Sequence, residues 1–462
     1  MVFVNRVSEL QALQAWWDRP GAGLGLVWGR RRVGKTALLA HFAEGRRTVF
    51  HTASGRPVGD ELRMLSLAAT PALAGGLRDL AARPFTGWDD AFEALGLAAE
   101  QEPMLLVLDE FPELVDATPE LPGVVRALWD RLRSRTNLKV IFAGSAVRSM
   151  EAIQVQRAPL YGRLDLSLLL HPFAPHEAAL MLPRLRPADR ALVWGLVGGV
   201  PLYLEWWDQR RTVADNLREL ACTPGGRLLS EGDFLLATEG DLGDLGRRVL
   251  FAIAGGRTKH NEIADAIRAD PTRALERLVR LRLIERLTPV TEDPRRTRRT
   301  LYRIADNFLN FWLGLLDRHR AEIDRGFQGG ILATVVQGLD DHLGHPWEEA
   351  FRSHLRRLAA AGQFGDDVVA VGPFWNASQD PAEIDAVVLA GRSRSAVLVG
   401  EAKWTPRVDG SRLRRELEGR ALALPRRAAH CGYAICARDR VTNPADLLRV
   451  TATDIFRVPT DP

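Results

Sequence analysis

A short loop near the N-terminus has the residue types and the spacing to bind phosphate. It starts at Gly29 and ends in Gly34, Lys35 and Thr36, which is the pattern of a phosphate-binding loop. In such a loop, backbone N–H groups surround the β-phosphate, the lysine reaches the β- and γ-phosphate oxygens, and the threonine hydroxyl binds Mg²⁺. We therefore expect ATP and Mg²⁺ to bind here. The residues expected to contact the nucleotide are Gly29, Arg30, Arg31, Arg32, Val33, Gly34, Lys35, Thr36 and Ala37.

Lysine is rare in this chain, which strengthens the interpretation of Lys35. The 62 basic residues include only four lysines, and Lys35 and Lys403 are two of them. A lysine in such an arginine-rich sequence is a candidate for chemistry that arginine cannot do, because an ammonium group is a compact point charge.

Two acidic residues follow an apolar run and complete the expected nucleotide site. Met104–Leu108 predicts a strand, and Asp109 and Glu110 follow it directly. We expect Asp109 to hold Mg²⁺ together with Thr36, and Glu110 to act as the base that activates the attacking water. This pairing of motifs predicts ATP hydrolysis.

Two further side chains are candidates for sensing the γ-phosphate. Ser145 ends the next apolar run, and its pattern fits a polar sensor or a helix N-cap equally well. Arg163 is the candidate arginine finger or phosphate sensor, because a guanidinium can bridge developing charge. A plain surface role is the alternative for Arg163.

A second group of chemically suitable residues lies near the C-terminus. The β-like runs Ala382–Leu389 and Ala396–Trp404 are joined by a short polar turn and predict a hairpin. Glu401 and Lys403 are two apart and share a face of their strand, and Asp385 on the partner strand can reach the same point. Two carboxylates and a lysine are suited to phosphodiester cleavage with a divalent cation, Mg²⁺ or Mn²⁺.

The elements that position the first group are predicted to form an α/β unit. Apolar runs recur at Leu24–Trp28, Thr48–Thr52, Met104–Leu108, Lys139–Ala143 and Leu164–Leu170, with helical patterns between them. The runs are continuous rather than alternating, which indicates strands buried on both faces. We therefore expect a parallel sheet covered by helices.

The middle of the chain has the pattern of a winged helix-turn-helix. Leu245–Ala254, His260–Ile267 and Pro271–Ile284 predict three helices, and Glu285–Arg303 predicts the wing. DNA contact and a domain-packing module with a solvated basic face are both open for this segment. The basic residues of the third helix and the wing are Arg273, Arg277, Arg280, Arg295, Arg296, Arg298 and Arg299.

Composition sets limits on the class of protein. The chain has 462 residues, 46% of them apolar, with a formal net charge of +4 and three cysteines. This length favours about three domains. The cysteines form no disulfide framework or metal array, and no apolar stretch is long enough to span a membrane. We expect a cytoplasmic protein with no membrane partner.

The N-terminal part resembles the archaeal-type P-loop ATPases of the AAA+/STAND group. The resemblance implies that Asn5 and Arg6 lie near the adenine and that the Gly198–Pro201 turn belongs to a helical lid. From the residue pattern alone, Arg6 and Glu9 fit an ordinary helix-face pair. The motifs that carry the resemblance are Phe3-x-Asn5-Arg6-x-x-Glu9-Leu10, the phosphate-binding loop, Asp109-Glu110-Phe111, Leu160–Arg163 and Gly198–Pro201.

The C-terminal part resembles the core of PD-(D/E)xK nucleases, within the domain of unknown function that closes many archaeal-type ATPases. The resemblance implies that Glu348, on a helix starting near Gly344, joins Asp385 and Glu401 as a metal ligand. The proline of the motif is replaced here by Ile384. A nuclease fold whose site has decayed into a scaffold is the alternative.

These observations predict an α/β ATPase coupled to a DNA-binding, metal-dependent nuclease domain. The main alternative is a STAND-like switch in which ATP controls assembly and the nuclease-like domain only binds a partner or DNA. DNA is the expected partner, with a homo-oligomer or a partner protein also open. The expected domains are an ATPase core at 1–170, a helical lid at 171–238, a winged helix-turn-helix at 239–306, a helical linker at 307–342 and a nuclease-like domain at 343–462.

Overall fold

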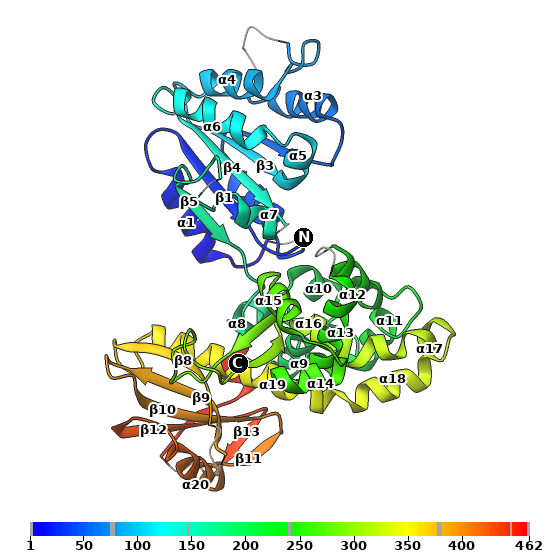
Figure 1. The fold of residues 1–462 in the computed structure, drawn as a ribbon, viewed down its shortest axis with the longest axis vertical. Coiled ribbons are helices and arrows are strands. Elements are labelled where there is room, and N and C mark those ends of the chain that lie inside the picture. The colour runs from blue at the N-terminus through cyan, green and yellow to red at the C-terminus, as the bar shows by residue number, and fades with distance from the viewer. Residues whose placement is uncertain are drawn as a thin grey trace. The chain divides into compact units, whose positions relative to one another are not determined.

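The computed structural model describes residues 3–73, 79–145, 147–156, 158–238, 242–376, 381–443 and 446–459. The chain divides into two compact units, Met1–Pro172 and Phe173–Pro462, which we call the first unit and the second unit (Figure 1). The sequence-predicted boundary at residue 239 lies outside the described residues.

The first unit is built on a five-stranded sheet with the strand order β2-β3-β4-β1-β5. All four strand pairs are parallel, as the continuous apolar runs predicted. The carboxyl ends of β1 and β3 therefore lie at the same edge of the sheet, where the phosphate-binding loop and Asp109 follow them. The strands are β1 (Gly23–Trp28), β2 (Thr48–Thr52), β3 (Met104–Asp109), β4 (Leu138–Gly144) and β5 (Leu166–Leu169).

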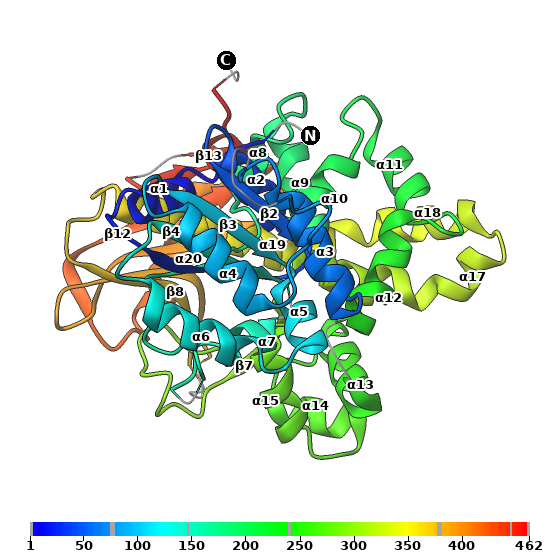
Figure 2. The same ribbon diagram turned by 90° about the horizontal axis from the view of Figure 1, so that it is seen from above.

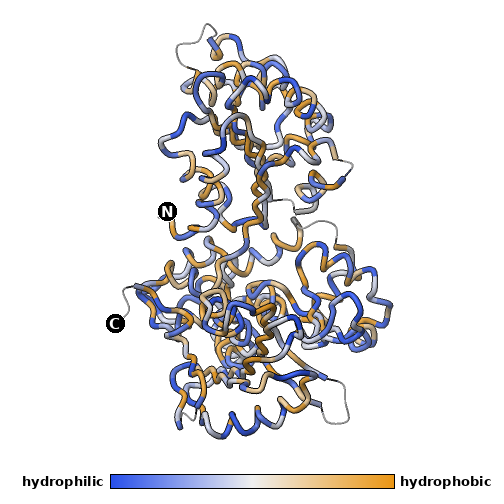
Figure 3. The backbone as a smooth tube through the Cα atoms, turned by 90° about the vertical axis from the view of Figure 1, so that its left-hand side faces the viewer, coloured by the Kyte–Doolittle hydropathy of each residue, from blue (hydrophilic) through white to orange (hydrophobic). Residues whose placement is uncertain are grey.

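Helices cover both faces of this sheet (Figure 2). One face packs Val107 and Ile141 against α1 and α2, and the other packs Leu106 and Phe142 against α3, α4 and α6. Figure 3 shows the hydrophobic strands running through the middle of the unit. The helices are α1 (Val7–Trp17), α2 (Lys35–Ala43), α3 (Val58–Ala69), α4 (Trp88–Ala98), α5 (Phe111–Ala117), α6 (Leu121–Leu132) and α7 (Val147–Ala152).

The second unit begins with helices in the segment predicted as a lid. Gly199 is required at the turn before α10, because a Cβ there would lie 1.8 Å from the carbonyl oxygen of Phe173. The helices are α8 (Pro175–Ala179), α9 (Pro187–Val197), α10 (Pro201–Trp206), α11 (Val213–Leu220) and α12 (Arg227–Thr238).

Three helices and a two-stranded antiparallel sheet follow. They are α13 (Gly243–Ala254), α14 (His260–Ile267), α15 (Thr272–Arg280), β6 (Ile284–Leu287) and β7 (Leu301–Ile304). The second helix has its predicted bounds, but α15 ends before the predicted Ile284. Arg282 has a left-handed φ of 56°, which an α-helix cannot include.

A largely helical stretch leads to the last sheet. It comprises α16 (Asn307–Phe311), a π-helical turn (Trp312–Leu316), a 3₁₀ turn (Asp317–His319), α17 (Arg320–Asp324), α18 (Gln328–Gln337) and α19 (Leu339–Ala360). We predicted that the last helix starts near Gly344, but it starts at Leu339 and includes Pro346. Burial of Leu339, Leu343 and Pro346 offsets the helix hydrogen bond that proline cannot make. The predicted boundary at 342/343 therefore lies inside a helix.

The C-terminal sheet has the order β14-β12-β10-β9-β8. The predicted hairpin is present, because β9 and β10 pair in antiparallel register. Phe351 of α19 packs against one face, and Leu413 and Leu417 of α20 pack against the other. The elements are β8 (Val368–Trp375), β9 (Glu383–Ala390), β10 (Ser395–Lys403), β11 (Arg407–Asp409), α20 (Gly410–Ala421), β12 (Arg427–Ala437), β13 (Arg440–Thr442), β14 (Leu448–Val450) and α21 (Ala452–Ile455).

Candidate ATP site and C-terminal carboxylate site

The phosphate-binding loop lies between β1 and α2, as its pattern requires. Lys35 is buried, and its ammonium group donates to the carbonyl oxygens of Gly29 and Arg30, both at 3.0 Å. Gly34 has a left-handed φ of 92°, which glycine adopts without strain. The ammonium group is therefore held inside the loop that we expect to surround the phosphates.

Thr36 and Asp109 meet at the carboxyl edge of the sheet. The Thr36 hydroxyl donates to Asp109 Oδ2 at 2.6 Å. Burial raises the pKa of Asp109, although the hydrogen bond from Thr36 opposes this rise. A hydroxyl and a carboxylate are the oxygen ligands that Mg²⁺ takes from proteins. The pair therefore fits the predicted metal.

Glu110 lies directly beside this pair and contacts the predicted sensor residue. Its φ is 51°, and its carboxylate accepts hydrogen bonds from Ser145 Oγ at 2.9 and 3.1 Å and from Ser145 N at 3.3 Å. The structure thus places Ser145 against the residue that we predicted as the catalytic base.

Arg6 and Arg163 were also predicted to contribute to the ATP site, and both form bonds with protein groups. Arg6 is buried, donates to the Val33 carbonyl oxygen at 2.7 Å and pairs with Glu9 at 2.8 Å. Arg163 donates to both carboxylate oxygens of Asp130 on α6, at 3.0 and 2.7 Å. The roles of Asn5 and Arg6 near the adenine and of Arg163 as a finger stay predictions.

In the second unit, the predicted catalytic residues of the hairpin lie close together. Glu401 is buried and accepts from Lys403 Nζ at 2.7 Å and from Arg420 Nη1 of α20 at 2.8 Å. Asp385 accepts from the backbone N–H of Ala402 at 2.8 Å. Burial, followed by the charges of Glu401 and Glu348, raises the pKa of Asp385 to about 7. Glu401 and Glu348 are therefore near enough to Asp385 to repel its ionised form.

Glu348 is surrounded by basic side chains. It lies 3.5 Å from Arg303 of β7, 3.6 Å from Arg352 and 3.4 Å from His345. Burial opposes its ionisation, but these basic neighbours lower the pKa of Glu348 to about 2. Glu348 is thus ionised and already paired.

The predicted second metal site is not assembled as a group of three ligands. Throughout the described parts of the chain, no cluster of three or more His, Cys, Asp or Glu side chains is arranged to hold a metal ion. Glu348, which we expected to join Asp385 and Glu401, pairs with Arg303 and Arg352 instead. Since Mg²⁺ often takes only one or two protein carboxylates, Asp385 and Glu401 remain a candidate pair.

Three arginines of this site were missed in the sequence. Arg352 lies four residues after Glu348, on the same face of α19, so helix spacing could have identified it. Arg303 and Arg420 come from β7 and α20. No local pattern relates them to the carboxylates, because tertiary packing alone brings these elements together.

The N-terminal part of the chain has relatives of known class. Residues 3–206 match the family model of an ATPase domain found predominantly in Archaea. The first unit and the helices up to α10 are therefore similar to an archaeal-type ATPase domain. Residues 312–414 match a second family, described as archaeal and bacterial proteins of unknown function.

Individual relatives agree with this assignment. An uncharacterized protein of Methanocaldococcus jannaschii is 26% identical over 415 residues, which are 87% of this chain and 88% of that protein. An uncharacterized ATP-binding protein of the same organism is 45% identical over 47 residues, 10% of this chain and 80% of that protein. A Walker-type ATPase of Pyrococcus abyssi matches with a TM-score of 0.52 and 21% identity, over 67% of this chain and 96% of its own. The last likeness shows that the two chains share a fold.

No helix within the described residues combines the length and the apolar character needed to cross a bilayer.

Proposed function

We propose that this protein binds and hydrolyses ATP and that its second unit is a DNA-binding, metal-dependent nuclease. The observation that carries the first part is the hydrogen bond of 2.6 Å between Thr36 and Asp109 beside the buried Lys35. It joins the phosphate-binding loop to the acidic strand end in the arrangement that Mg²⁺-dependent phosphoryl transfer requires.

The residues of the ATPase domain divide the chemistry among them. Thr36 and Asp109 hold Mg²⁺, which neutralises phosphate charge when it is bound. Lys35 leaves the carbonyls of Gly29 and Arg30 and pairs with the β- and γ-phosphates. Glu110 orients and deprotonates the attacking water once Ser145 releases its carboxylate.

DNA binding is proposed for α13–α15 and the β6–β7 hairpin as a winged helix-turn-helix. The helix α15 buries Ala274, Leu275 and Leu278 on one face and exposes Arg273 and Arg280. The four wing arginines at positions 295, 296, 298 and 299 are exposed as well. Such a basic surface is suited to phosphate contacts, which supply most nonspecific affinity for DNA.

A nuclease site is proposed around the β9–β10 hairpin. Asp385 and Glu401 would hold a divalent cation, which would supply Lewis-acid activation at this site. Lys403 orients the water or pairs with the phosphate. Burial, followed by repulsion from Glu401 and Glu348, raises the pKa of Asp385 to about 7. This supports the proposal, since a bound cation would relieve the repulsion.

One observation favours the alternative of an ATP-driven switch without cleavage. Glu401 is neutralised by Lys403 and Arg420, and Glu348 by Arg303 and Arg352. Carboxylates that are already paired with basic side chains fit a domain that serves as a scaffold and does not cleave DNA.

A cleavage assay separates these two functions. Labelled single-stranded, duplex and branched DNA are incubated with Mg²⁺ or Mn²⁺, with and without ATP, using the wild type, Glu401→Gln and Glu110→Gln. The control is Glu416→Gln, which changes an exposed pair with Arg412. We expect Glu401→Gln to lose cleavage and keep ATP turnover. Glu110→Gln should lose turnover by about 100-fold or more.

The other outcomes are equally informative. Absence of cleavage by the wild type, with ATP still hydrolysed, would favour the switch. Absence of both ATP binding and turnover would overturn the proposed function.

A further inference from the structure

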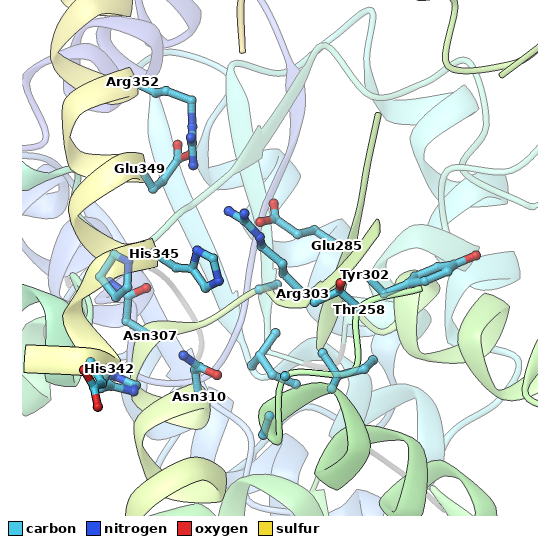
Figure 4. A pocket seen from close by; sticks show the side chains of 17 residues that line it. Thr258, Glu285, Tyr302, Arg303, Asn307, Asn310, His342, His345, Glu349 and Arg352 are labelled. Carbon is cyan, nitrogen blue, oxygen red and sulfur yellow. The ribbon is translucent and has the colours of Figure 1, made fainter. Parts of the chain in front are cut away.

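A cavity of about 350 Å³ lies inside the second unit. Its walls come from the end of α13, the β6–β7 hairpin, α16 and the first half of α19 (Figure 4). This volume is within the range of small-molecule sites in proteins. All of its lining residues belong to the second unit, whereas the phosphate-binding loop belongs to the first.

Two buried polar atoms of its lining lack a hydrogen-bond partner within the described structure: Arg303 Nε and His342 Nε2. Burial lowers the pKa of His342 to about 4, and its ring donates to the backbone of Gly195. A neutral histidine that donates through one nitrogen accepts through the other. The cavity therefore has an unused donor on Arg303 and an unused acceptor on His342, and buried groups of this kind are costly to leave unpaired.

Two more polar side chains of the lining are available. Within the described residues, neither the Glu285 carboxylate nor the Asn310 side-chain amide forms a hydrogen bond or an ion pair. Figure 4 shows Arg303 between Glu285 and His345. A ligand that satisfies this lining must present both donors and acceptors.

Basic groups at one side of the lining are suited to an anion. Arg303 and His345 line the cavity, and both also contact Glu348. A phosphate can pair with the guanidinium through charge-assisted hydrogen bonds. Base edges offer the mixed donors and acceptors that Glu285, Asn310 and His342 require.

We propose that this cavity binds a single nucleotide unit, with its phosphate at Arg303 and His345 and its base at Glu285, Asn310 and His342. The nucleotide is either free or the end of a DNA strand. The second source rests on the proposed nuclease function, because Glu348 connects the cavity to the carboxylates of that site. Pairing of Arg303 with phosphate would also weaken its contact with Glu348, which would keep Arg352.

Calorimetric titration tests the proposal without any cleavage step. The full-length Lys35→Ala protein, whose phosphate-binding loop is disabled, is titrated without divalent metal. The ligands are the four deoxynucleoside monophosphates, the four ribonucleoside monophosphates and inorganic phosphate. We expect saturable binding of at least one monophosphate, at least tenfold tighter than that of inorganic phosphate. Equal binding of phosphate, or no binding, overturns the proposal.

Substitutions of lining residues test whether the ligand binds in the cavity. Asn310→Leu and Glu285→Gln, made in the Lys35→Ala protein, should each weaken binding at least tenfold or change the preferred base. Glu276→Gln, an exposed change on α15, should leave binding within twofold. Unchanged binding in both cavity variants, with thermal unfolding also unchanged, overturns the assignment.

Oligonucleotides distinguish the two sources. A short 5′-phosphorylated strand that competes with the monophosphate indicates a strand end, whereas monophosphate binding without such competition indicates a free nucleotide. The two proposals can fail separately. Cleavage that depends on Glu401 but no monophosphate binding would reject only the cavity, and monophosphate binding without cleavage would reject only the nuclease.

Discussion

At the scale of single residues, Arg6 forms a hydrogen bond to the phosphate-binding loop, although it lies outside the loop in the sequence. Its guanidinium is buried and joins the Val33 carbonyl oxygen to the Glu9 carboxylate. Arg6 itself has a left-handed φ of 67°, an unusual conformation for a residue with a side chain. Arg6 therefore connects the N-terminal helix to the phosphate-binding loop.

Replacement of Arg6 by Gln should loosen the loop. A buried, charge-assisted hydrogen bond contributes about 1.5–3 kcal/mol, so we expect a loss of this size in the free energy of unfolding and roughly tenfold weaker ATP binding. Chemical denaturation and nucleotide titration measure the two effects. Arg63→Gln, which changes an exposed side chain on α3, is the control and should have neither effect. A variant that binds ATP as the wild type does would contradict the role of Arg6.

His354 makes the stability of the second unit depend on pH. It is 8% exposed, and burial, followed by the charge of Arg357, lowers the pKa of His354 to about 4. The unfolded state binds a proton near pH 6.5 and the folded state does not. Stability is therefore complete above pH 6.5 and falls as the pH decreases toward 4, by up to roughly 3 kcal/mol from this residue.

His354→Gln should remove that part of the pH dependence, because glutamine can accept from Arg357 but does not titrate. Free energies of unfolding of the two proteins, measured from pH 4 to 8, give the difference. We expect it to favour the variant increasingly below pH 6.5. A difference that stays constant across this range would show that His354 does not carry the effect.

At the scale of elements, the sequence predicted the strands better than the sites they carry. Leu24–Trp28 and Lys139–Ala143 are apolar throughout, so only a strand buried on both faces suits them, and β1 and β4 occupy these positions. The pairing of Glu348 with Arg303 has no such signal, because it depends on how β7 packs against α19. Local sequence patterns indicate which residues are buried. The pairing of side chains from different elements can be identified only in the assembled fold.

Close packing of α12 on the π-helical turn gives a test at this scale. A Cβ at Gly232 would lie 2.1–2.4 Å from the ring of Trp312, which is 1% exposed and donates to the Leu229 carbonyl oxygen at 2.8 Å. Gly232→Ala should therefore cost about 1–3 kcal/mol of stability through overpacking.

The matched control is the same substitution at a helical glycine with free space. A Cβ at Gly344 in α19 meets nothing within 4 Å. Gly344→Ala should stabilise the protein by about 0.5–1 kcal/mol, the difference in helix propensity. Denaturant unfolding of both variants measures the contrast. Equal effects of the two substitutions would refute the packing argument.

At the scale of the whole molecule, α9 connects the parts of the second unit. Gly195 of α9 faces Leu343 of α19, Asn307 donates to the Trp194 carbonyl oxygen at 3.1 Å, and Trp194 contacts Phe456. One hydrophobic cluster includes residues of α9, α13–α16, α19 and the C-terminal sheet. We therefore expect a displacement of α9 to be transmitted to the candidate nuclease site.

Arg190 is the residue that should break this connection. It is 1% exposed and donates to the carbonyl oxygens of Leu182, Pro183 and Phe456 at 3.0, 3.0 and 2.9 Å. Arg190→Met removes all three hydrogen bonds, although the Leu182 carbonyl oxygen keeps the one from the Leu185 N–H. The loss should cost about 3–5 kcal/mol and make the segment around Phe456 sensitive to proteases.

Arg186→Met is the control for this prediction, because Arg186 is 83% exposed in its side chain and pairs with Asp189. We expect it to change stability by about 0.5 kcal/mol or less. Limited proteolysis followed by mass spectrometry, together with thermal unfolding, reports on both variants. Protease resistance of Arg190→Met equal to that of Arg186→Met would exclude the connecting role.

The bond between Arg190 and Phe456 also has a consequence for synthesis on the ribosome. The two residues are 266 positions apart, and translation adds about 5–20 residues per second. For more than roughly ten seconds, α9 therefore exists without Phe456. During this time the guanidinium of Arg190 lacks its hydrogen bond to that residue. We expect the helices around α9 to be accessible to chaperones during this time and to complete their folding only after Phe456 has been made.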